Sequence, residues 1–172
     1  MNKSAIYAVL VIILIVAGGF YYYRSTYFGT VDVYVTTGNA DPVYLTISSI
    51  MIHSTSGQWI TISNKSTTVL LSGNLSFLAS STVPTGNYTE LRLIVTSGIV
   101  EIGGINISVS VPSGVLKIPI VAGGLHVSGS TTERLEIIIG PHLVSVGNGK
   151  YIISPVITAE QFDSLNIPTY FS

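Results

Sequence analysis

The chain has 172 residues, a formal net charge of −1 and no cysteine; 47% of its residues are hydrophobic and only 9% are charged. A chain without a basic excess generates no attractive field for nucleic acid, so that class of partner is excluded. The lack of cysteine excludes thiolate metal sites and cysteine nucleophiles, and it leaves an exported domain to be held by packing alone.

The chain begins with an uncharged apolar run, Ala5–Tyr23, between Lys3 and Arg24. About 19 residues at about 1.5 Å per residue make roughly 28 Å of helix, which is close to the hydrocarbon thickness of a bilayer. Aromatic rings and long cationic side chains are favoured where a helix leaves the membrane. The predicted interface residues are therefore Tyr21, Tyr22, Tyr23 and Arg24. This interpretation makes residues 1–24 a transmembrane anchor.

The same segment also fits a signal peptide, with Met1–Ser4 as its basic start. Ala17 and Gly19 are small residues at the spacing that a signal peptidase needs, so cleavage after Gly19 is the alternative. The length of the run and its aromatic end favour the anchor. Both interpretations put the N-terminus in the cytoplasm and the domain outside, because Lys3 and the α-amino group precede the run.

After a linker at residues 25–29, the hydrophobic pattern has a period of two, which predicts strands in one domain over residues 30–172. Turn residues separate short strands at intervals of about 8 to 12 residues, a pattern typical of an antiparallel β-sandwich of the immunoglobulin-like, Greek-key type. The expected strands are 30–36, 43–53, 58–62, 67–71, 75–78, 88–96, 99–102, 105–111, 115–120, 125–128, 132–139, 143–146 and 151–159. A phase shift at Ser48–Ser49 predicts a β-bulge. A short helical turn capped by Thr158 is expected near the end.

One turn in this all-β pattern has a structural interpretation of its own. Pro84 presets a backbone angle for the turn, and Gly86 permits a positive φ. Tyr88 can then return its hydroxyl to the turn backbone while its ring packs inside, as in a tyrosine corner. Pro84, Gly86 and Tyr88, together with Trp59, are predicted as structural residues.

Three features occur in a familiar order: a strand that ends in His53 and is followed by Trp59, the segment Val83–Leu93, and the segment Gly149–Ile157. Together they resemble the family called domain of unknown function 4382, a group of microbial surface and secreted β-sandwich proteins. The resemblance covers most of residues 30–159 and implies a sandwich that works outside the cell. The family's Asp-x-Pro turn after the first strand is shortened here to Asp41–Pro42.

No group of residues in the sequence predicts a reaction. The three histidines are isolated from one another, at His53, His126 and His142. Catalysis or metal binding needs such groups to converge with carboxylates, so we expect an enzyme activity, a metal and a cofactor to be absent. Glu90, Arg92 and the segment Glu133–Glu136 are instead expected to form cross-strand ion pairs on an outer face.

Four Asn-x-Ser/Thr sequons follow the apolar run, at Asn64, Asn74, Asn87 and Asn106. Glycans attached there would solvate a surface that has few charges. We therefore expect at least two of the four sequons to carry glycans.

These features predict a non-enzymatic cell-surface protein, anchored in the cell membrane through residues 5–23, with a structural or adhesive role. Its expected partners are the membrane, other surface proteins or copies of itself, and glycans. If cleavage occurs after Gly19, the alternative is a secreted subunit of an extracellular filament. The new N-terminal arm, Phe20–Phe28, would then add a strand to the sheet edge of the next subunit.

Overall fold

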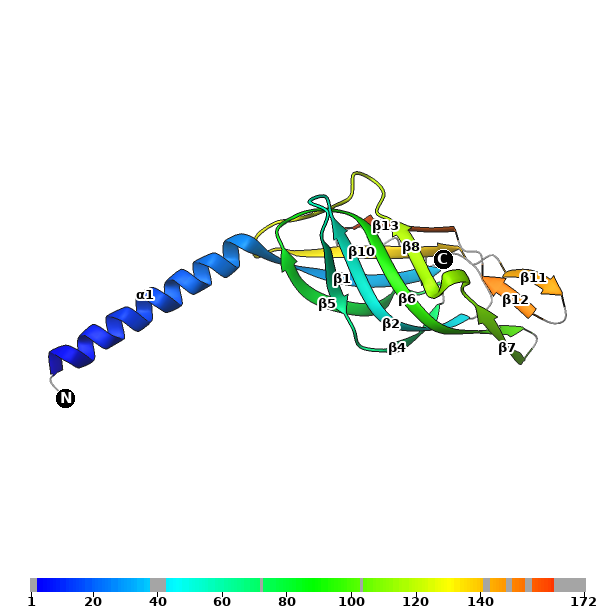
Figure 1. The fold of residues 1–172 in the computed structure, drawn as a ribbon, viewed down its shortest axis with the longest axis horizontal. Coiled ribbons are helices and arrows are strands. Elements are labelled where there is room, and N and C mark those ends of the chain that lie inside the picture. The colour runs from blue at the N-terminus through cyan, green and yellow to red at the C-terminus, as the bar shows by residue number, and fades with distance from the viewer. Residues whose placement is uncertain are drawn as a thin grey trace, which may run out of the picture.

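A computed structural model of the chain describes residues 3–37, 43–71, 73–102, 104–140, 143–147, 150–153 and 156–162. One long helix runs away from a body built of strands (Figure 1). The elements are the helix α1 (Lys3–Tyr27) and the strands β1 (Phe28–Thr37), β2 (Val43–Ser54), β3 (Trp59–Ser63), β4 (Thr67–Leu71), β5 (Ser76–Pro84), β6 (Gly86–Ile102), β7 (Ile105–Ser110), β8 (Val115–Pro119), β9 (Leu125–Val127), β10 (Thr132–Gly140), β11 (Leu143–Gly147), β12 (Lys150–Ile153) and β13 (Val156–Gln161), with a 3-10 turn η1 (Pro112–Gly114) before β8.

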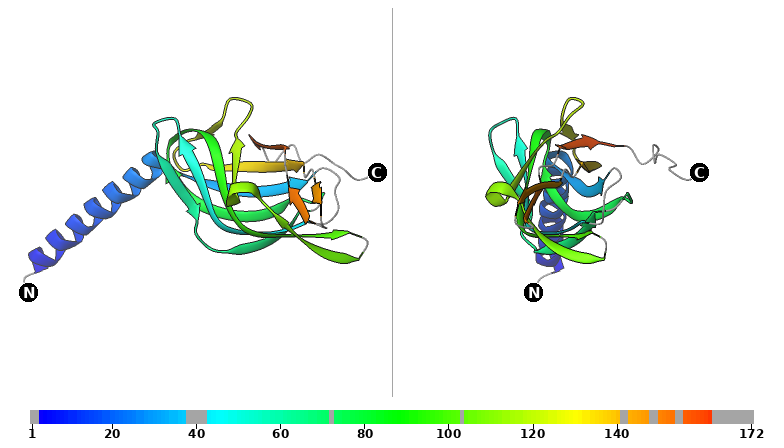
Figure 2. Two further views of the ribbon diagram at one scale, coloured as in Figure 1. Left: turned by 45° about the vertical axis from the view of Figure 1, so that its right-hand side comes forward. Right: turned by 90° about the vertical axis from the view of Figure 1, so that its right-hand side faces the viewer.

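The strands form two sheets, which confirms the predicted all-β class and its sandwich architecture (Figure 2). The first sheet has the order β13-β10-β1-β5, and the second has the order β11-β12-β7-β6-β2-β3. β4 also pairs with β2, and β8 and β9 pair with β6. The layers meet at one side, where Ile120 bridges to Ala159 and the amide of Val121 donates to the Ala159 carbonyl at 2.7 Å.

The strand directions and lengths add detail that the hydrophobic pattern does not carry. Among the named strands that the structure describes, all pairings are antiparallel except β1 with β10 and β7 with β12. β6 is one strand of 17 residues, so the prediction of two strands, 88–96 and 99–102, separated at Ser97–Gly98, is wrong. The expected strand 151–159 is divided between β12 and β13, which lie in different sheets. The helical turn capped by Thr158 is wrong, because Thr158 lies within β13.

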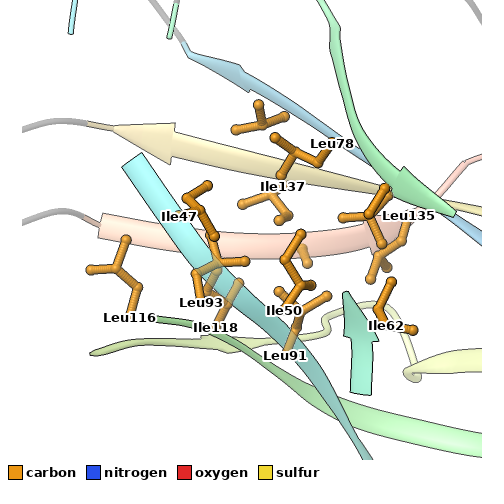
Figure 3. Packing of buried hydrophobic residues seen from close by; sticks show 14 of the residues in the cluster. Ile47, Ile50, Ile62, Leu78, Leu91, Leu93, Leu116, Ile118, Leu135 and Ile137 are labelled. Carbon is orange, nitrogen blue, oxygen red and sulfur yellow. The ribbon is translucent and has the colours of Figure 1, made fainter. Parts of the chain in front are cut away.

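The core lies between the two sheets and follows from the alternation along each strand. In β1, Val31, Val33 and Val35 are buried, while the residues between them face outward. Figure 3 shows side chains of the second sheet, such as Ile47 and Leu93, lying opposite Leu135 and Ile137 of β10. Each aliphatic side chain that is fully buried in this way contributes about 1.5–3 kcal/mol.

The bulge predicted at Ser48–Ser49 is confirmed. The register between β2 and β6 shifts between Ile47 and Ser49. As a result, Ile47 and Ile50, which are three positions apart, are both buried in the same core. A regular strand would have turned one of them to solvent, because its side chains alternate with a period of two.

Candidate functional site

The helix α1 is the most distinctive feature of the molecule. It is long and apolar enough to cross a membrane, and it is the one such helix in the described residues. None of its residues is buried, and Leu14 in its middle is 71% exposed. An apolar surface of this kind is unfavourable in water, so the helix is compatible with a membrane anchor or a signal sequence.

The predicted interface residues all lie near the end of α1 that meets the domain. Tyr21 and Tyr22 project outward and are strongly exposed. The Tyr23 ring instead contacts the rings of Tyr27 and Phe28, with centroids 5.0 and 5.9 Å apart. The Arg24 guanidinium carbon lies 5.8 Å from the centre of the Phe28 ring. Their placement at the membrane interface stays a prediction.

The linker predicted at residues 25–29 is wrong. Residues 25–27 continue the helix, and Phe28 is already the first residue of β1. The prediction failed because serine and threonine next to glycine usually indicate a loop, whereas here contacts to the domain hold these residues in regular structure. The helix therefore passes into the first sheet with no flexible chain between them.

Hydrogen bonds from two domain loops hold the end of α1. The Ser130 hydroxyl donates to the carbonyl of Ser25 at 3.1 Å, and the Thr85 amide donates to the carbonyl of Tyr27 at 2.9 Å. The Ser130 amide also donates to the Phe28 carbonyl at 2.9 Å. The last carbonyls of a helix have no partner within the helix, so the domain supplies the donors that they lack.

Close packing at this junction requires a residue without a side chain at Gly129. A Cβ atom built there would collide with the carbonyl oxygens of Ser25 and Thr26. Its neighbour Ser130 has a left-handed backbone, with φ of 59°, which costs about 1–2 kcal/mol for a residue other than glycine. The loop between β9 and β10 is therefore shaped to receive the helix end, and its strain is offset by the bonds that Ser130 makes.

The tyrosine corner supports the second loop of the junction. The Tyr88 hydroxyl donates to the Pro84 carbonyl at 2.6 Å, and Gly86 has a φ of 149°. The Tyr88 residue is only 1% exposed, and burial raises the pKa of its hydroxyl. Because the corner fixes the turn on both sides of Thr85, it also positions the amide that bonds to the helix end.

Trp59 belongs to a cluster on the outer face of the second sheet, not to the core. The Arg92 guanidinium carbon lies 3.9 Å from the centre of the Trp59 ring, and the His53 ring centroid lies 4.6 Å from that of Trp59. Arg92 Nε also contacts Glu90 Oε1 at 2.8 Å. The four side chains form a half-buried stack that covers β2, β3 and β6.

The predicted ion pairs between Glu90, Arg92 and residues 133–136 are wrong. Glu90 and Arg92 pair with each other within β6, in the second sheet, whereas β10 belongs to the first. Glu133 instead accepts hydrogen bonds from Thr131 Oγ1 at 2.7 Å and from Gln161 Nε2 at 2.6 Å. Glu136 has a raised pKa because it is partly buried and because Glu160 lies opposite it on β13.

The four sequon asparagines are all exposed, and they lie at different places on the domain. Asn64 Oδ1 accepts a hydrogen bond from the Ser49 hydroxyl at 2.8 Å, and Asn87 Oδ1 lies 2.7 Å from His126 Nδ1. Asn106 lies in β7, and Asn74 lies in the turn before β5. The contacts of Asn64 and Asn87 described above use the side-chain oxygen, and a glycan is attached through the nitrogen. Glycosylation at these positions stays a prediction.

The described residues contain no cluster of three or more histidine, aspartate or glutamate side chains that would hold a metal ion. His53 and His126 lie in the second sheet on strands that flank β6 on opposite sides, and they contact Trp59 and Asn87 respectively. His142 lies outside the described residues.

The residues that sequence reasoning missed are those of the junction, Thr85, Gly129 and Ser130. Ser130 and Ser25 are 105 positions apart, and nothing in their local sequence distinguishes them from other turn residues. A long-range contact of this kind leaves no periodic pattern that could have indicated it.

A comparison with protein-family models identifies the family of the domain. The model of a domain of unknown function, DUF4382, matches residues 28–155, about three quarters of the chain. The chain belongs to the DUF4382 family. The resemblance inferred from the sequence is thus confirmed, and the DUF4382 match begins at Phe28, the residue at which α1 gives way to β1. No curated protein matches this DUF4382 chain.

Proposed function

We propose that this protein is a non-enzymatic, membrane-anchored surface protein, in which α1 is retained and holds the DUF4382 domain outside the cell. The observation that carries the proposal is α1 itself, an exposed apolar helix long enough to span a bilayer that continues without a break to the domain. The helix enters β1 without a break, and its last carbonyls are bonded to the domain through Ser130 and Thr85. These bonded residues follow Gly19 and would remain after either outcome, so the junction supports a rigid hold on the domain, whereas retention is supported by the length and apolar surface of the uninterrupted helix.

The position of the alternative cleavage point also supports retention. Gly19 lies inside α1, and cleavage after it would leave residues 20–27 as a stub of about two turns. Isolated helices shorter than about 12–15 residues are marginal in water. Such a stub would expose Tyr21 and Tyr22 to solvent, whereas a bilayer interface would accommodate their rings.

The filament alternative finds no support in this arrangement. The arm that would be donated, residues 20–28, is helical through Tyr27 and not extended. The strand that follows it, β1, is paired on one side with β10 and on the other with β5 of its own domain. We therefore propose the anchored protein and not the filament subunit.

A structural or adhesive role completes the proposal. The sandwich presents Ser, Thr and Asn side chains on its outer faces, and its exposed sequons are suited to carry glycans. Lys3, which precedes the apolar run, favours a cytoplasmic side for the start of α1, which leaves the domain and its sequons on the outer side. The proposed partners are other surface proteins, copies of this chain, and glycans.

N-terminal sequencing and intact mass of the native membrane-bound protein test the proposal, with Gly19→Leu as a matched variant. We expect Met1–Gly19 to be present, apart from loss of the initiator methionine, and the wild type and Gly19→Leu to have the same mature length. Leucine blocks a signal peptidase site but preserves an apolar helix. A wild-type protein that begins at Phe20, with Gly19→Leu retaining the longer form, would refute the anchor.

A further inference from the structure

We propose that one surface of the domain lies within the lipid headgroup layer of the membrane that α1 spans. This surface, called here the membrane-proximal surface, consists of Ser25–Tyr27, the turn Pro84–Gly86 and the loop Ser128–Thr131. The inference rests on the anchor proposed above and adds a contact that a flexible tether would not make.

The first argument is the length of the helix. The uncharged run Ala5–Tyr23 comprises 19 residues, which at about 1.5 Å each span roughly 28 Å, close to the thickness of a hydrocarbon core, with the Tyr21–Tyr23 rings at its edge. Arg24, Ser25, Thr26 and Tyr27 add only about 6 Å of helix. The headgroup region on each side of a bilayer is about 5–8 Å thick. The end of α1 therefore lies inside the headgroup layer, and not beyond it.

The second argument is that the domain cannot move away from this end. No residue separates Tyr27, the last of α1, from Phe28, the first of β1. The Ser130 hydroxyl reaches the carbonyl of Ser25, one residue beyond Arg24, at 3.1 Å. The loop Ser128–Thr131 thus lies beside the last turn of the helix, at the same depth as the residues that leave the hydrocarbon.

The third argument is the chemistry of the membrane-proximal surface. Its ten residues are serine, threonine, glycine, proline and tyrosine, and none of them carries a charge. Hydroxyl groups can bond to the ester and phosphate oxygens of lipids, and the exposed ring of Tyr27 is of the type favoured at a membrane interface. Glu133, an acid close to this surface, accepts hydrogen bonds from Thr131 and Gln161, so its charge is satisfied within the protein.

The lack of charge has a consequence for lipid preference. A basic segment next to an anionic bilayer gains about 1 kcal/mol for each Lys or Arg. The membrane-proximal surface offers no such residue, and the single Arg24 before it adds only about 1 kcal/mol, so its contact with headgroups should not require anionic lipid or low salt. The contact is instead imposed by the covalent and hydrogen-bonded junction with α1.

Depth measurements on the full chain in phosphatidylcholine nanodiscs test the inference, and the cysteine-free sequence allows single-site labelling. A small fluorophore is attached to Thr85→Cys in the membrane-proximal surface, to Asn106→Cys on β7, or to Ile12→Cys within α1. Lipids carrying a nitroxide in the headgroup or in the acyl chain serve as quenchers. Thr131→Cys is a second proximal site, for use if the label at Thr85 disturbs the fold.

We expect the acyl-chain nitroxide to quench the label at Ile12, and the headgroup nitroxide to quench the label at Thr85 several-fold more than the label at Asn106. Insertion of eight Gly/Ser residues between Tyr27 and Phe28 should reduce quenching at Thr85 to the level at Asn106. Replacing about a third of the lipid by phosphatidylserine should leave the pattern unchanged, because the surface has no charge to respond.

The possible results separate the inference from the proposal on which it rests. If Ile12 is quenched from the acyl chains while Thr85 and Thr131 behave like Asn106, the anchor stands and the headgroup contact is refuted. If Ile12 is not quenched, the anchor itself fails. Quenching at Thr85 that requires phosphatidylserine would overturn the uncharged contact proposed here.

Discussion

The Ser130 hydroxyl donates a 3.1 Å hydrogen bond to the carbonyl of Ser25, although 105 positions separate the two residues in the chain. The bond joins a loop of the sandwich to the last turn of an apolar helix. With the Thr85–Tyr27 bond and the close approach at Gly129, it makes the helix and the domain one folded unit.

The fit at Gly129 predicts that a single methyl group weakens the junction. In Gly129→Ala the new Cβ collides with the backbone oxygens of Ser25 and Thr26, which cannot rotate away as a side chain could. We expect a loss of about 1–3 kcal/mol, as for other overpacked sites, measured by thermal unfolding of the full chain in detergent micelles.

A second glycine provides the control for this change. Gly19 lies on α1, and a Cβ atom added to it would have nothing within 4 Å. Gly19→Ala should therefore be neutral or slightly stabilising, because alanine favours helix. Equal unfolding temperatures for Gly129→Ala and Gly19→Ala would show that the junction is loose.

The tyrosine corner predicts a modest and specific effect of Tyr88→Phe. The substitution keeps the buried ring but removes the hydroxyl that donates to the Pro84 carbonyl at 2.6 Å. Loss of one such bond costs about 0.5–1.5 kcal/mol, which urea denaturation would detect as a lower midpoint with an unchanged slope. Tyr44→Phe, at an exposed ring on β2, should stay within about 0.5 kcal/mol of wild type. A midpoint for Tyr88→Phe equal to that of Tyr44→Phe would contradict the prediction.

The stack on the second sheet predicts that Arg92 controls the environment of Trp59. The chain has one tryptophan, so its fluorescence reports this site alone. Arg92→Ala removes the guanidinium 3.9 Å from the ring centre and should shift the emission to longer wavelength as water reaches the indole. A cation–π contact of this kind contributes about 0.5–1 kcal/mol.

Lys117 offers a matched control, because it is a cation that lies opposite Arg92 in the pairing of β6 with β8. Within the part of the chain that the structure describes, the cation over the Trp59 ring is that of Arg92 and not that of Lys117. We expect Lys117→Ala to leave the emission of Trp59 unchanged. The same spectrum for Arg92→Ala and wild type would mean that the stack does not persist in solution.

The pair Glu136 and Glu160 predicts how stability responds to pH. Partial burial and the facing Glu160 raise the pKa of Glu136 above its ordinary value of 4.5. The folded state therefore binds this proton more tightly than the unfolded state, and stability falls as the pH rises from 4.5 through the folded-state pKa. Glu136→Gln should be more stable than wild type at neutral pH and should lose that advantage below pH 4.5.

The second carboxyl group of the pair gives an internal check. Glu160→Gln removes the facing charge and should reproduce part of the stabilisation at neutral pH, because it removes one of the two causes of the raised pKa of Glu136. Chemical denaturation at a series of pH values measures both variants. Parallel stability curves for Glu136→Gln and wild type at all pH values would refute the prediction.

The sequons predict a mass difference between native and unmodified protein. We expect the native protein to be heavier than its sequence by at least two glycans, and each modified site to lose one glycan when its asparagine becomes glutamine. Asn106→Gln tests one of these exposed sites, on β7. A native mass equal to that of the unmodified chain would refute the prediction that the sequons carry glycans.

Much of the fold was predictable because the alternation of apolar and polar residues along a strand indicates which side chains are buried. Val31, Val33 and Val35 indicate one inward face of β1, and the phase shift at Ser48–Ser49 indicates the bulge that brings Ile47 and Ile50 to the same core. These signals are local, since neighbouring side chains of a strand point to opposite faces.

The features that escaped prediction depend on contacts between distant segments. The parallel pairing of β1 with β10 has no local signature, because the same alternation suits either direction. The uninterrupted course of β6 through Gly98 depends on its pairing with β7 and β2 along both edges. The helical state of Ser25–Tyr27 likewise depends on donors from Thr85 and Ser130, so composition alone indicated a linker.

The direct passage from α1 into β1 also couples the orientation of the domain to that of the helix, because no residue separates the two elements. In the proposed anchored protein, a rotation of α1 about its own axis would turn the hairpin of β6 and β7, at the far end of the domain in Figure 1, through the same angle. A neighbouring protein that binds the membrane-spanning part of α1 would then reorient this hairpin without contacting the sandwich.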